Sequence, residues 1–326
     1  MLTIAQKEMR GAALAPMAGV ADKSMRALCV EQGACFCVGE MVSAKALALG
    51  DKKSAQLLQI GNLEHPAGVQ LFGMDPDVFC CALPQALAVR PAFLDINMGC
   101  PAPKIVGGGA GAALMKDPVR AAEIVRSTVR EIALLGAELP VSVKCRVGWD
   151  ENDRNVVDFA KRVEAAGAAF LTIHGRTRRQ MYAPPVDYRS IAAVKSAVKI
   201  PVIANGNVTD GQTAKEMLAR TGCDLVMVGR GAMGRPWVFA QIAASLNGRD
   251  FAPPSIAEQM GAMLRHVRML CADKGERIGM CEARKHAAWY LKGMRGAAQK
   301  RAQITSMVSI DQLEHIAEEL IAENAD

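Results

Sequence analysis

The chain is poor in aromatic side chains, which make up only 4% of its 326 residues. Because 51% of the residues are apolar, the core must instead be built from Ala, Val, Leu, Ile and Met, and it can be large. Histidine is also scarce, with five in all, and no two of these stand at ligand spacing with a cysteine or carboxylate. We therefore expect no catalytic metal. The lack of a Ser-His-Asp set, or of two carboxylates at a clear spacing, argues against hydrolysis.

Long apolar runs are missing as well. No run approaches the length of a membrane span, and residues 1–10 lack the apolar centre of a signal peptide. The ten cysteines form no C-x-x-C pair and no regular framework, which is typical of a reduced environment. We therefore expect a cytoplasmic monomer with no membrane partner. Its net charge of +6 permits a polyanionic partner without requiring one.

Short apolar runs alternate with longer amphipathic ones from residue 12 to about 247, a pattern typical of β/α units around a parallel sheet. The strands expected are Ala12 to Met17, Phe36 to Met41, Gly68 to Phe72, Phe93 to Ile96, Val141 to Cys145, Phe170 to Ile173, Pro201 to Ala204 and Leu225 to Val228. Eight units of this size predict an α/β (β/α)8 TIM barrel over residues 1–247. An open doubly wound sheet is the alternative.

Beyond Pro253 and Pro254 the periodicity becomes purely helical, which predicts a small all-helical domain over residues 255–326. The helices expected there are Ile256 to Cys271, Glu282 to Met294 and Ser309 to Ala322. Its charge is divided. Residues 265–301 contain ten Lys or Arg against three acidic residues, whereas residues 311–326 contain six acidic residues and no Lys or Arg. The basic part, with Trp289 and Tyr290, would suit contact with a nucleic-acid backbone, although it could equally be a solvated face or pair with the acidic part.

The segment 95–111 displays a thiol. An apolar run leads into Asn97, Gly99, Cys100 and Pro101, which end a strand and hold the chain in a loop. Pro101 and Pro103 should deny this loop a helical continuation. Cys100 is thus predicted to lie at the end of a strand, although one of ten cysteines could equally be a small buried hydrophobe.

In a barrel, the carboxyl ends of the strands carry the chemistry. Here nearly all of them deliver glycines or polar residues, which predicts a site for something large and polar. The segments 205–207 and 229–231 follow the last two strands, where barrels commonly hold a phosphate. Residues 229–234 also spell G-x-G-x-x-G, but a dinucleotide-binding fold would carry this motif in its first unit. Lys144 should point its ammonium into the mouth of the barrel, where it could stabilise a reduced flavin.

Taken together, these motifs resemble those of the tRNA-dihydrouridine synthase family. They are A-P-M-A-G-V at 15–20, D-I-N-M-G-C-P at 95–101, H-G-R-T-R at 174–178, P-V-I-A-N-G at 201–206, and G-R-G-A with G-R-P-W at 229–237. In the helical part, A-R-K-H at 283–286 with W-Y-L at 289–291 resembles the bacterial B-type branch. The chain departs from the family pattern at Gly107, Gly108 and Ala112, where basic residues and a serine are usual, and at Asn207, where Asp is common.

The resemblance implies an FMN enzyme that uses NADPH to reduce the 5,6 double bond of a D-loop uridine in tRNA. Hydride would pass from reduced FMN to C6, and Cys100 would give a proton to C5. The residues that would hold FMN are Pro16, Met17, Ala18, Gln70, Lys144, His174, Asn205, Gly206, Asn207, Gly229 and Arg230. The substrate would contact Asn97, Arg176, Arg178, Arg284 and Lys285.

Two other functions fit the same residues. An FMN barrel acting on a free pyrimidine or another small enone would leave the basic helical segment without a role. A flavin-free RNA-binding protein would leave the strand ends unexplained. A yellow colour of the purified protein would exclude the flavin-free RNA-binding protein.

Overall fold

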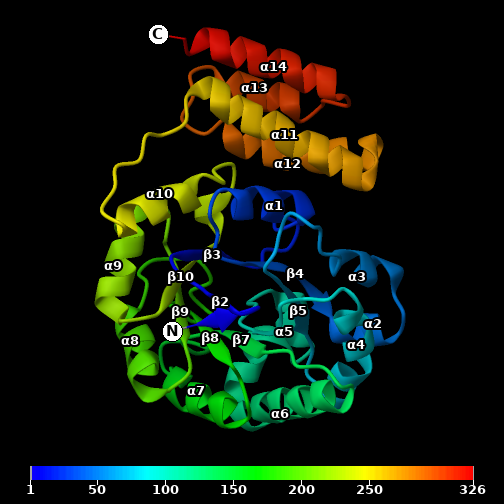
Figure 1. Cartoon of the computed structure of the whole chain (residues 1–326), viewed down its shortest axis with the longest axis vertical. Helices are drawn as coiled ribbons and strands as arrows, with labels where there is room; N and C mark the ends of the chain where they lie inside the picture. Colours follow the sequence, from blue (N-terminus) through cyan, green and yellow to red (C-terminus); the bar gives the residue numbers. More distant parts are fainter. Residues whose placement is uncertain (1, 326) are drawn as a thin grey trace.

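Eight parallel strands close into a barrel within residues 2–325, the part of the chain that this computed structural model describes. Their order around the barrel is β3-β4-β5-β6-β7-β8-β9-β10, with β10 pairing back onto β3 (Figure 1). The strands are β3 (Ala12–Leu14), β4 (Cys37–Ser43), β5 (Ala67–Phe72), β6 (Phe93–Met98), β7 (Val141–Arg146), β8 (Phe170–His174), β9 (Val202–Asn205) and β10 (Leu225–Val228). The predicted TIM barrel is confirmed, and the open sheet is wrong.

Helices surround the barrel and bury their apolar faces on its strands. They are α1 (Lys23–Glu31), α2 (Ala44–Ala48), α3 (Lys52–Leu57), α4 (Pro76–Ala88), α5 (Pro103–Gly107), α6 (Pro118–Leu134), α7 (Val156–Ala165), α8 (Tyr188–Ala197), α9 (Gly211–Thr221) and α10 (Val238–Leu246), with 3₁₀ turns at η1 (Gly111–Lys116) and η2 (Arg230–Ala232). The expectation that Pro103 would prevent a helix is wrong, because Pro103 begins α5. Proline is tolerated in a first turn, where its missing N–H has no partner to lose.

The amino-terminal end of the barrel is closed by a hairpin that the sequence patterns did not predict. It consists of β1 (Thr3–Ile4) and β2 (Lys7–Glu8). Leu2, Ile4 and Met9 pack there against an edge-to-face cluster of Phe36, Phe93 and Phe170 inside the barrel. This end is filled with side chains, so a ligand can enter only at the carboxyl ends of the strands.

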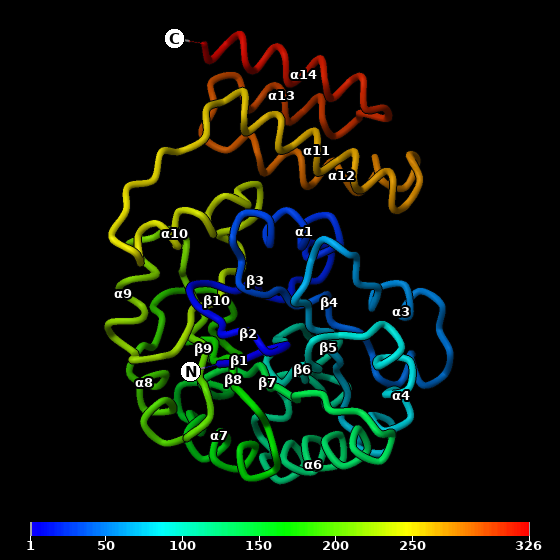
Figure 2. The backbone as a smooth tube through the Cα atoms, in the orientation of Figure 1, coloured from blue at the N-terminus to red at the C-terminus, as the bar shows by residue number. Residues whose placement is uncertain are grey.

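In the part of the chain that the structure describes, four helices follow the barrel and form a bundle beside α1 and α10 (Figures 1 and 2). They are α11 (Ile256–Lys274), α12 (Glu276–Tyr290), α13 (Ala297–Ile304) and α14 (Ile310–Glu323), of which α13 was not predicted. The bundle has a core of its own, into which Trp237 from the end of the barrel inserts. Ion pairs of Arg265 with Glu31 and of Lys23 with Asp273 also join bundle to barrel.

The basic and acidic segments of the bundle partly neutralise each other. Arg268 pairs with Glu314, and Lys300 pairs with Glu319 and Glu323. No helix in the described part of the chain is both long and apolar enough to cross a bilayer.

Candidate active site

A cavity of about 780 Å³ opens at the carboxyl ends of the strands. Its lining includes every residue that the family resemblance assigned to FMN, and also Cys100, Asn97 and Arg176. These residues stand far apart in the sequence. They meet because all eight parallel strands end at the same rim of the barrel.

The cavity is strongly basic. Six Lys or Arg side chains line it and, among the described residues of its wall, none is acidic: the six are Lys144, Arg146, Arg176, Arg230, Arg235 and Lys292. Burial lowers the pKa of Lys144 to about 8 and that of Arg146 to about 10. Burial, reinforced by Lys144 and the neighbouring arginines, lowers the pKa of His174 well below its usual range, so its ring is neutral at pH 7. Such a surface favours an anionic ligand.

A chain of buried hydrogen bonds starts at Asp95 on β6. Its carboxylate accepts from Ser142 Oγ (2.5 Å) and from the side-chain amide of Gln70 (2.6 Å). The Gln70 oxygen is thereby turned toward Asn97 and accepts from Asn97 Nδ2 (2.8 Å). Because an amide has one oxygen end and one nitrogen end, Asp95 determines the orientation of both amides in turn.

The same chain of hydrogen bonds fixes the loop that carries Cys100. Asn97 Oδ1 accepts from the backbone N–H groups of Gly99 (3.2 Å) and Cys100 (2.9 Å). On the other side, Arg146 Nε donates to the Gly99 carbonyl (2.7 Å) and the Ala112 N–H donates to the Cys100 carbonyl (3.0 Å). Cys100 is therefore a half-buried thiol on a held backbone facing the cavity.

The opposite wall is formed by the loops after β9 and β10. Lys144 Nζ donates to Asn205 Oδ1 (3.2 Å), and Arg176 Nη2 donates to Asn207 Oδ1 (2.8 Å). Gly206 has a φ of 134°, a conformation that strongly favours glycine, so the backbone can turn its polar groups toward the cavity there. Arg230 lies over the ring of Tyr182, 4.5 Å from its centroid.

Three predicted substrate residues lie outside the cavity. Arg178 stacks over the ring of Trp149 at 4.9 Å, and Arg284 donates twice to the Met307 carbonyl (2.9 and 3.0 Å). Lys285 places its ammonium beside Gly19, in the loop after β3. In contrast, Tyr182, Arg235 and Lys292 line the cavity without having been predicted. Lys292 comes from the bundle, and no sequence pattern shows which helix end reaches the barrel mouth.

Comparison with known proteins decides the family. The dihydrouridine synthase (Dus) family model matches residues 13–326. The chain belongs to this family. It is 41% identical over 296 residues to the "Probable tRNA-dihydrouridine synthase" of Rickettsia conorii, covering 90% of this chain and 88% of that protein. It is 39% identical over 299 residues to "tRNA-dihydrouridine synthase B" of Pseudomonas aeruginosa, covering 91% and 89%.

The barrel also resembles the solved structures of two other proteins. Histamine dehydrogenase from Rhizobium sp. 4-9 superposes with a TM-score of 0.55 at 11% identity, over 80% of this chain and 49% of that one. A variant of NCR from Zymomonas mobilis gives a TM-score of 0.50 at 16% identity, over 77% and 90%. At these identities the likeness concerns the fold alone.

Proposed function

We propose that this dihydrouridine synthase reduces the 5,6 double bond of a D-loop uridine in tRNA, with FMN as cofactor and NADPH as reductant. The observation that carries the proposal is a basic cavity with no acidic residue in its described wall. On one side of it lies Cys100, whose backbone N–H is hydrogen-bonded to Asn97, and on the other side lie glycine-containing loops. The tRNA in the names of relatives that are 39–41% identical supports the substrate. A tRNA substrate also supports the expected cytoplasmic location.

The residues fit FMN. Two loops, one with Asn205, Gly206 and Asn207 and the other with Gly229 and Arg230, would hold its phosphate. Both line the cavity, and the backbone N–H groups of such loops, with the Arg230 guanidinium, suit a phosphate. Gln70, Lys144 and His174, together with Pro16, Met17 and Ala18, would surround its ring. When bound, reduced flavin supplies a hydride. One phosphate-binding region at these two loops suits FMN better than FAD.

The chain's own residues would provide the proton and the positioning. The Cys100 thiol would protonate C5 of the uracil, and its loop is held in place by Asn97 and Arg146. Besides its bond to Gln70, the Asn97 amide donates to Met41 Sδ (3.6 Å), which is a weak acceptor. A carbonyl oxygen of the base would replace this sulfur as the acceptor. A base can reach this depth only when it leaves its stack, at a cost of a few kcal/mol, which is least in a loop.

Released cofactor and a Cys100 variant test the proposal. We expect the purified protein to be yellow and to release FMN, and we expect Cys100→Ala to oxidise NADPH normally while dihydrouridine formation in tRNA falls by about 10²–10⁴-fold, the usual contribution of a general acid. FAD in the released cofactor, or wild-type product yield from the variant in a single turnover, would contradict the site assignment. Turnover of free uracil would favour the small-substrate alternative, and colourless protein would favour a flavin-free RNA-binding role.

A further inference from the structure

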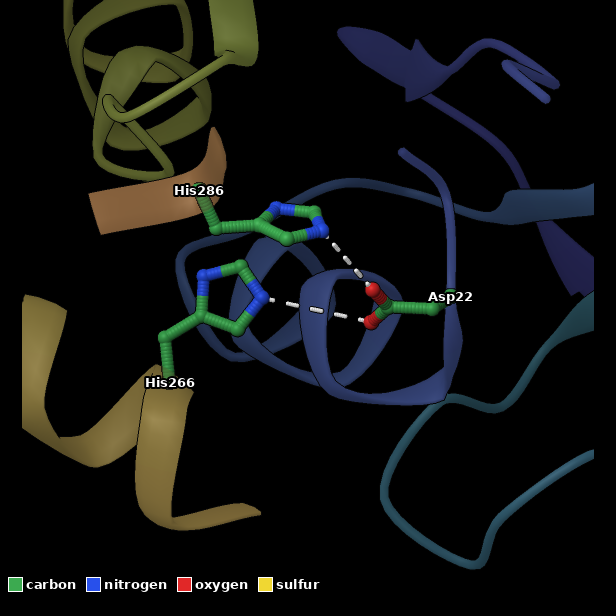
Figure 3. Close-up of side chains that lie close together, drawn as sticks. All are labelled: Asp22, His266 and His286. Carbon is green, nitrogen blue, oxygen red and sulfur yellow. Dashed lines mark ion pairs between the residues drawn. The ribbon is translucent and has the colours of Figure 1, made fainter. Parts of the chain in front are cut away.

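A second cluster of ionisable side chains lies at the junction of barrel and bundle. Asp22 precedes α1 in the barrel, His266 lies on α11 and His286 lies on α12 (Figure 3). All three are nearly inaccessible, with 5%, 1% and 1% of their surface exposed. Sequence spacing could not reveal this group, because its members come from both parts of the chain and meet only when the bundle docks.

The three side chains present unsatisfied atoms to one another. Six buried side-chain polar atoms lack a hydrogen-bond partner among the described residues, and three of them are Asp22 Oδ2, His266 Nε2 and His286 Nε2. His286 Nε2 is 3.2 Å from Asp22 Oδ2, and His266 Nε2 is 3.9 Å from Asp22 Oδ1, but neither ring nitrogen makes a well-directed hydrogen bond to the carboxylate. Buried polar atoms without partners cost stability, so their convergence calls for a ligand.

The remaining atoms of the cluster already have partners that leave these three free. Asp22 Oδ1 accepts from the Met25 N–H (2.9 Å), which caps α1, so Oδ2 is the available oxygen. His266 Nδ1 lies 3.2 Å from the Tyr290 hydroxyl, a contact that fixes its ring and leaves Nε2 to face Asp22. A hydrogen bond to the far ring nitrogen is the usual support of a metal-binding histidine.

We propose that Asp22, His266 and His286 bind a divalent transition-metal ion, with Zn²⁺ as the natural occupant, and that this ion clamps the bundle to the barrel. Two imidazoles and one carboxylate are a common Zn²⁺ ligand set. The three ligand atoms lie within 4.8 Å of one another. Zinc bonds are about 2.0–2.2 Å long, so ligands of one ion stand roughly 3–3.5 Å apart, which a small inward movement of the His266 ring achieves.

The position of the cluster gives the ion a structural role distinct from the proposed chemistry. Asp22 stands two residues after Val20, which lines the cavity with Met17 and Ala18. Fixing Asp22 to α11 and α12 therefore fixes the loop after β3 relative to the bundle, whose Lys292 reaches the cavity mouth.

The test uses the whole 326-residue chain, stripped of metal with EDTA, exposed to ZnCl₂ and desalted before elemental analysis. We expect the wild type to retain one zinc per chain and its Tm to rise by about 5 °C with zinc in large excess over Kd. Alkylation of the exposed Cys81 and Cys281 with N-ethylmaleimide should not change this stoichiometry. If the wild type retains no zinc, the proposal is wrong. It is also wrong if alkylation removes the zinc, because the ion would then be bound by cysteines.

Two variants locate the ion. Asp22→Asn keeps an oxygen that can accept from the Met25 N–H but removes the negative carboxylate. His286→Gln removes one imidazole. Each variant should weaken zinc binding by about 10–100-fold or more and abolish the rise in Tm. Asp51→Asn changes an exposed helix cap of the same type on α3, and His315→Gln changes an exposed histidine on α14; both should bind zinc like the wild type. Equal zinc binding in Asp22→Asn and the controls would refute the site.

Discussion

At the scale of single residues, Asp95 has more influence on the site than its distance from the cavity surface suggests. Burial raises its pKa from 3.8 to about 6. Above pH 6 its carboxylate accepts the hydrogen bonds from Gln70 and Ser142 that orient Asn97 and the Cys100 loop. Below pH 6 the acid carries a proton of its own and can no longer accept both bonds freely. Asp95 is therefore a positioning residue.

As pH falls, the protonation of Asp95 should lower the reaction rate but increase the stability of the fold. As pH falls through about 6, we expect the single-turnover rate to decrease because the chain of amides loses its acceptor. The folded-state pKa of Asp95 is above its unfolded value, so the ionised group costs stability above pH 6, and that cost diminishes as pH falls. Rate and Tm measured from pH 5 to 8 check this. A rate loss that simply follows unfolding would contradict it.

Substitution of Asp95 and its partner provides a second check. Asp95→Asn presents an amide to Gln70 and should lower the rate about 10-fold or more, the value of one hydrogen bond of about 1.4 kcal/mol, with tRNA affinity unchanged. Ser142→Ala removes a hydrogen bond to the ionised carboxylate and should move the acid limb of the rate profile to higher pH. An unshifted profile in Ser142→Ala would mean that another group titrates there.

The sequence allowed us to predict which residues at strand ends line the cavity. It did not allow us to predict what the long charged side chains on the helices contact. Gln70, Lys144 and Asn205 line the cavity because the closed barrel brings every strand end to one rim. Arg284 was expected to contact substrate, yet its guanidinium donates to the Met307 carbonyl. The partner of such a flexible side chain is chosen by tertiary neighbours, which local patterns do not contain.

At the scale of elements, seven of the eight barrel strands were predictable to within one or two residues because buried parallel strands are short apolar runs. The first was predicted to end at Met17 but ends at Leu14. The 297–304 helix was missed because its one-sided apolar pattern is weak and it follows the turn at Gly296. The amino-terminal hairpin was missed because its two strands have two residues each. Its role is clear only once the open end of the barrel is known.

The turn between η2 and α10 packs closely against the end of α12 in the bundle. Gly234 has a φ of 66°, and a Cβ there would lie 2.4 Å from the carbonyl carbon of Trp289 at the end of α12. We expect Gly234→Ala to lower the free energy of unfolding by about 1 kcal/mol for its φ and by about 1–3 kcal/mol more for the overlap. Chemical denaturation measures the sum.

Gly222→Ala is the matched control for this turn. Gly222 has nearly the same φ, 64°, at the end of α9, but a Cβ there would meet no atom within 4 Å. Gly222→Ala should therefore lower the free energy of unfolding only by the conformational cost of a positive φ, about 1 kcal/mol. If the two variants lose equal stability, the bundle does not press on Gly234 in solution, and the contact with Trp289 is looser than the structure indicates.

At the scale of the whole molecule, the bundle has less unpaired positive charge than its composition suggests, because several of its basic residues form ion pairs within the bundle. Arg268 and Lys300 pair with the acidic segment of α14, and Lys274 pairs with Glu282. Lys285 and Arg277 have no ion-pair partner within residues 2–325, and Lys292 faces the cavity. Of these, Lys285 lies beside Gly19 and Lys292 lines the cavity, so part of the bundle's positive charge available to RNA lies at the barrel mouth.

Lys285 is the residue at which a tRNA contact can be separated from stability. Its ammonium lies beside Gly19 at the edge of the loop after β3, so tRNA that places a base in the cavity would pass close to it. We expect Lys285→Ala to reduce the slope of log affinity against log salt by about 0.7–0.9, the value of one phosphate contact. FMN content and NADPH oxidation should not change. Lys161→Ala removes an equal charge from an exposed position on α7, far from the bundle, and should leave the slope unaltered.

Arg284→Ala should behave differently from its neighbour, because it removes two hydrogen bonds to a carbonyl that ties α12 to the segment before α14. Its Tm should fall, while its salt slope should stay near the wild-type value. If Lys285→Ala also keeps the wild-type slope, the RNA does not cross this side of the bundle. The contact surface would then lie at the other side of the cavity, where Arg178 stacks on Trp149, and Arg178→Ala should show the reduced slope instead.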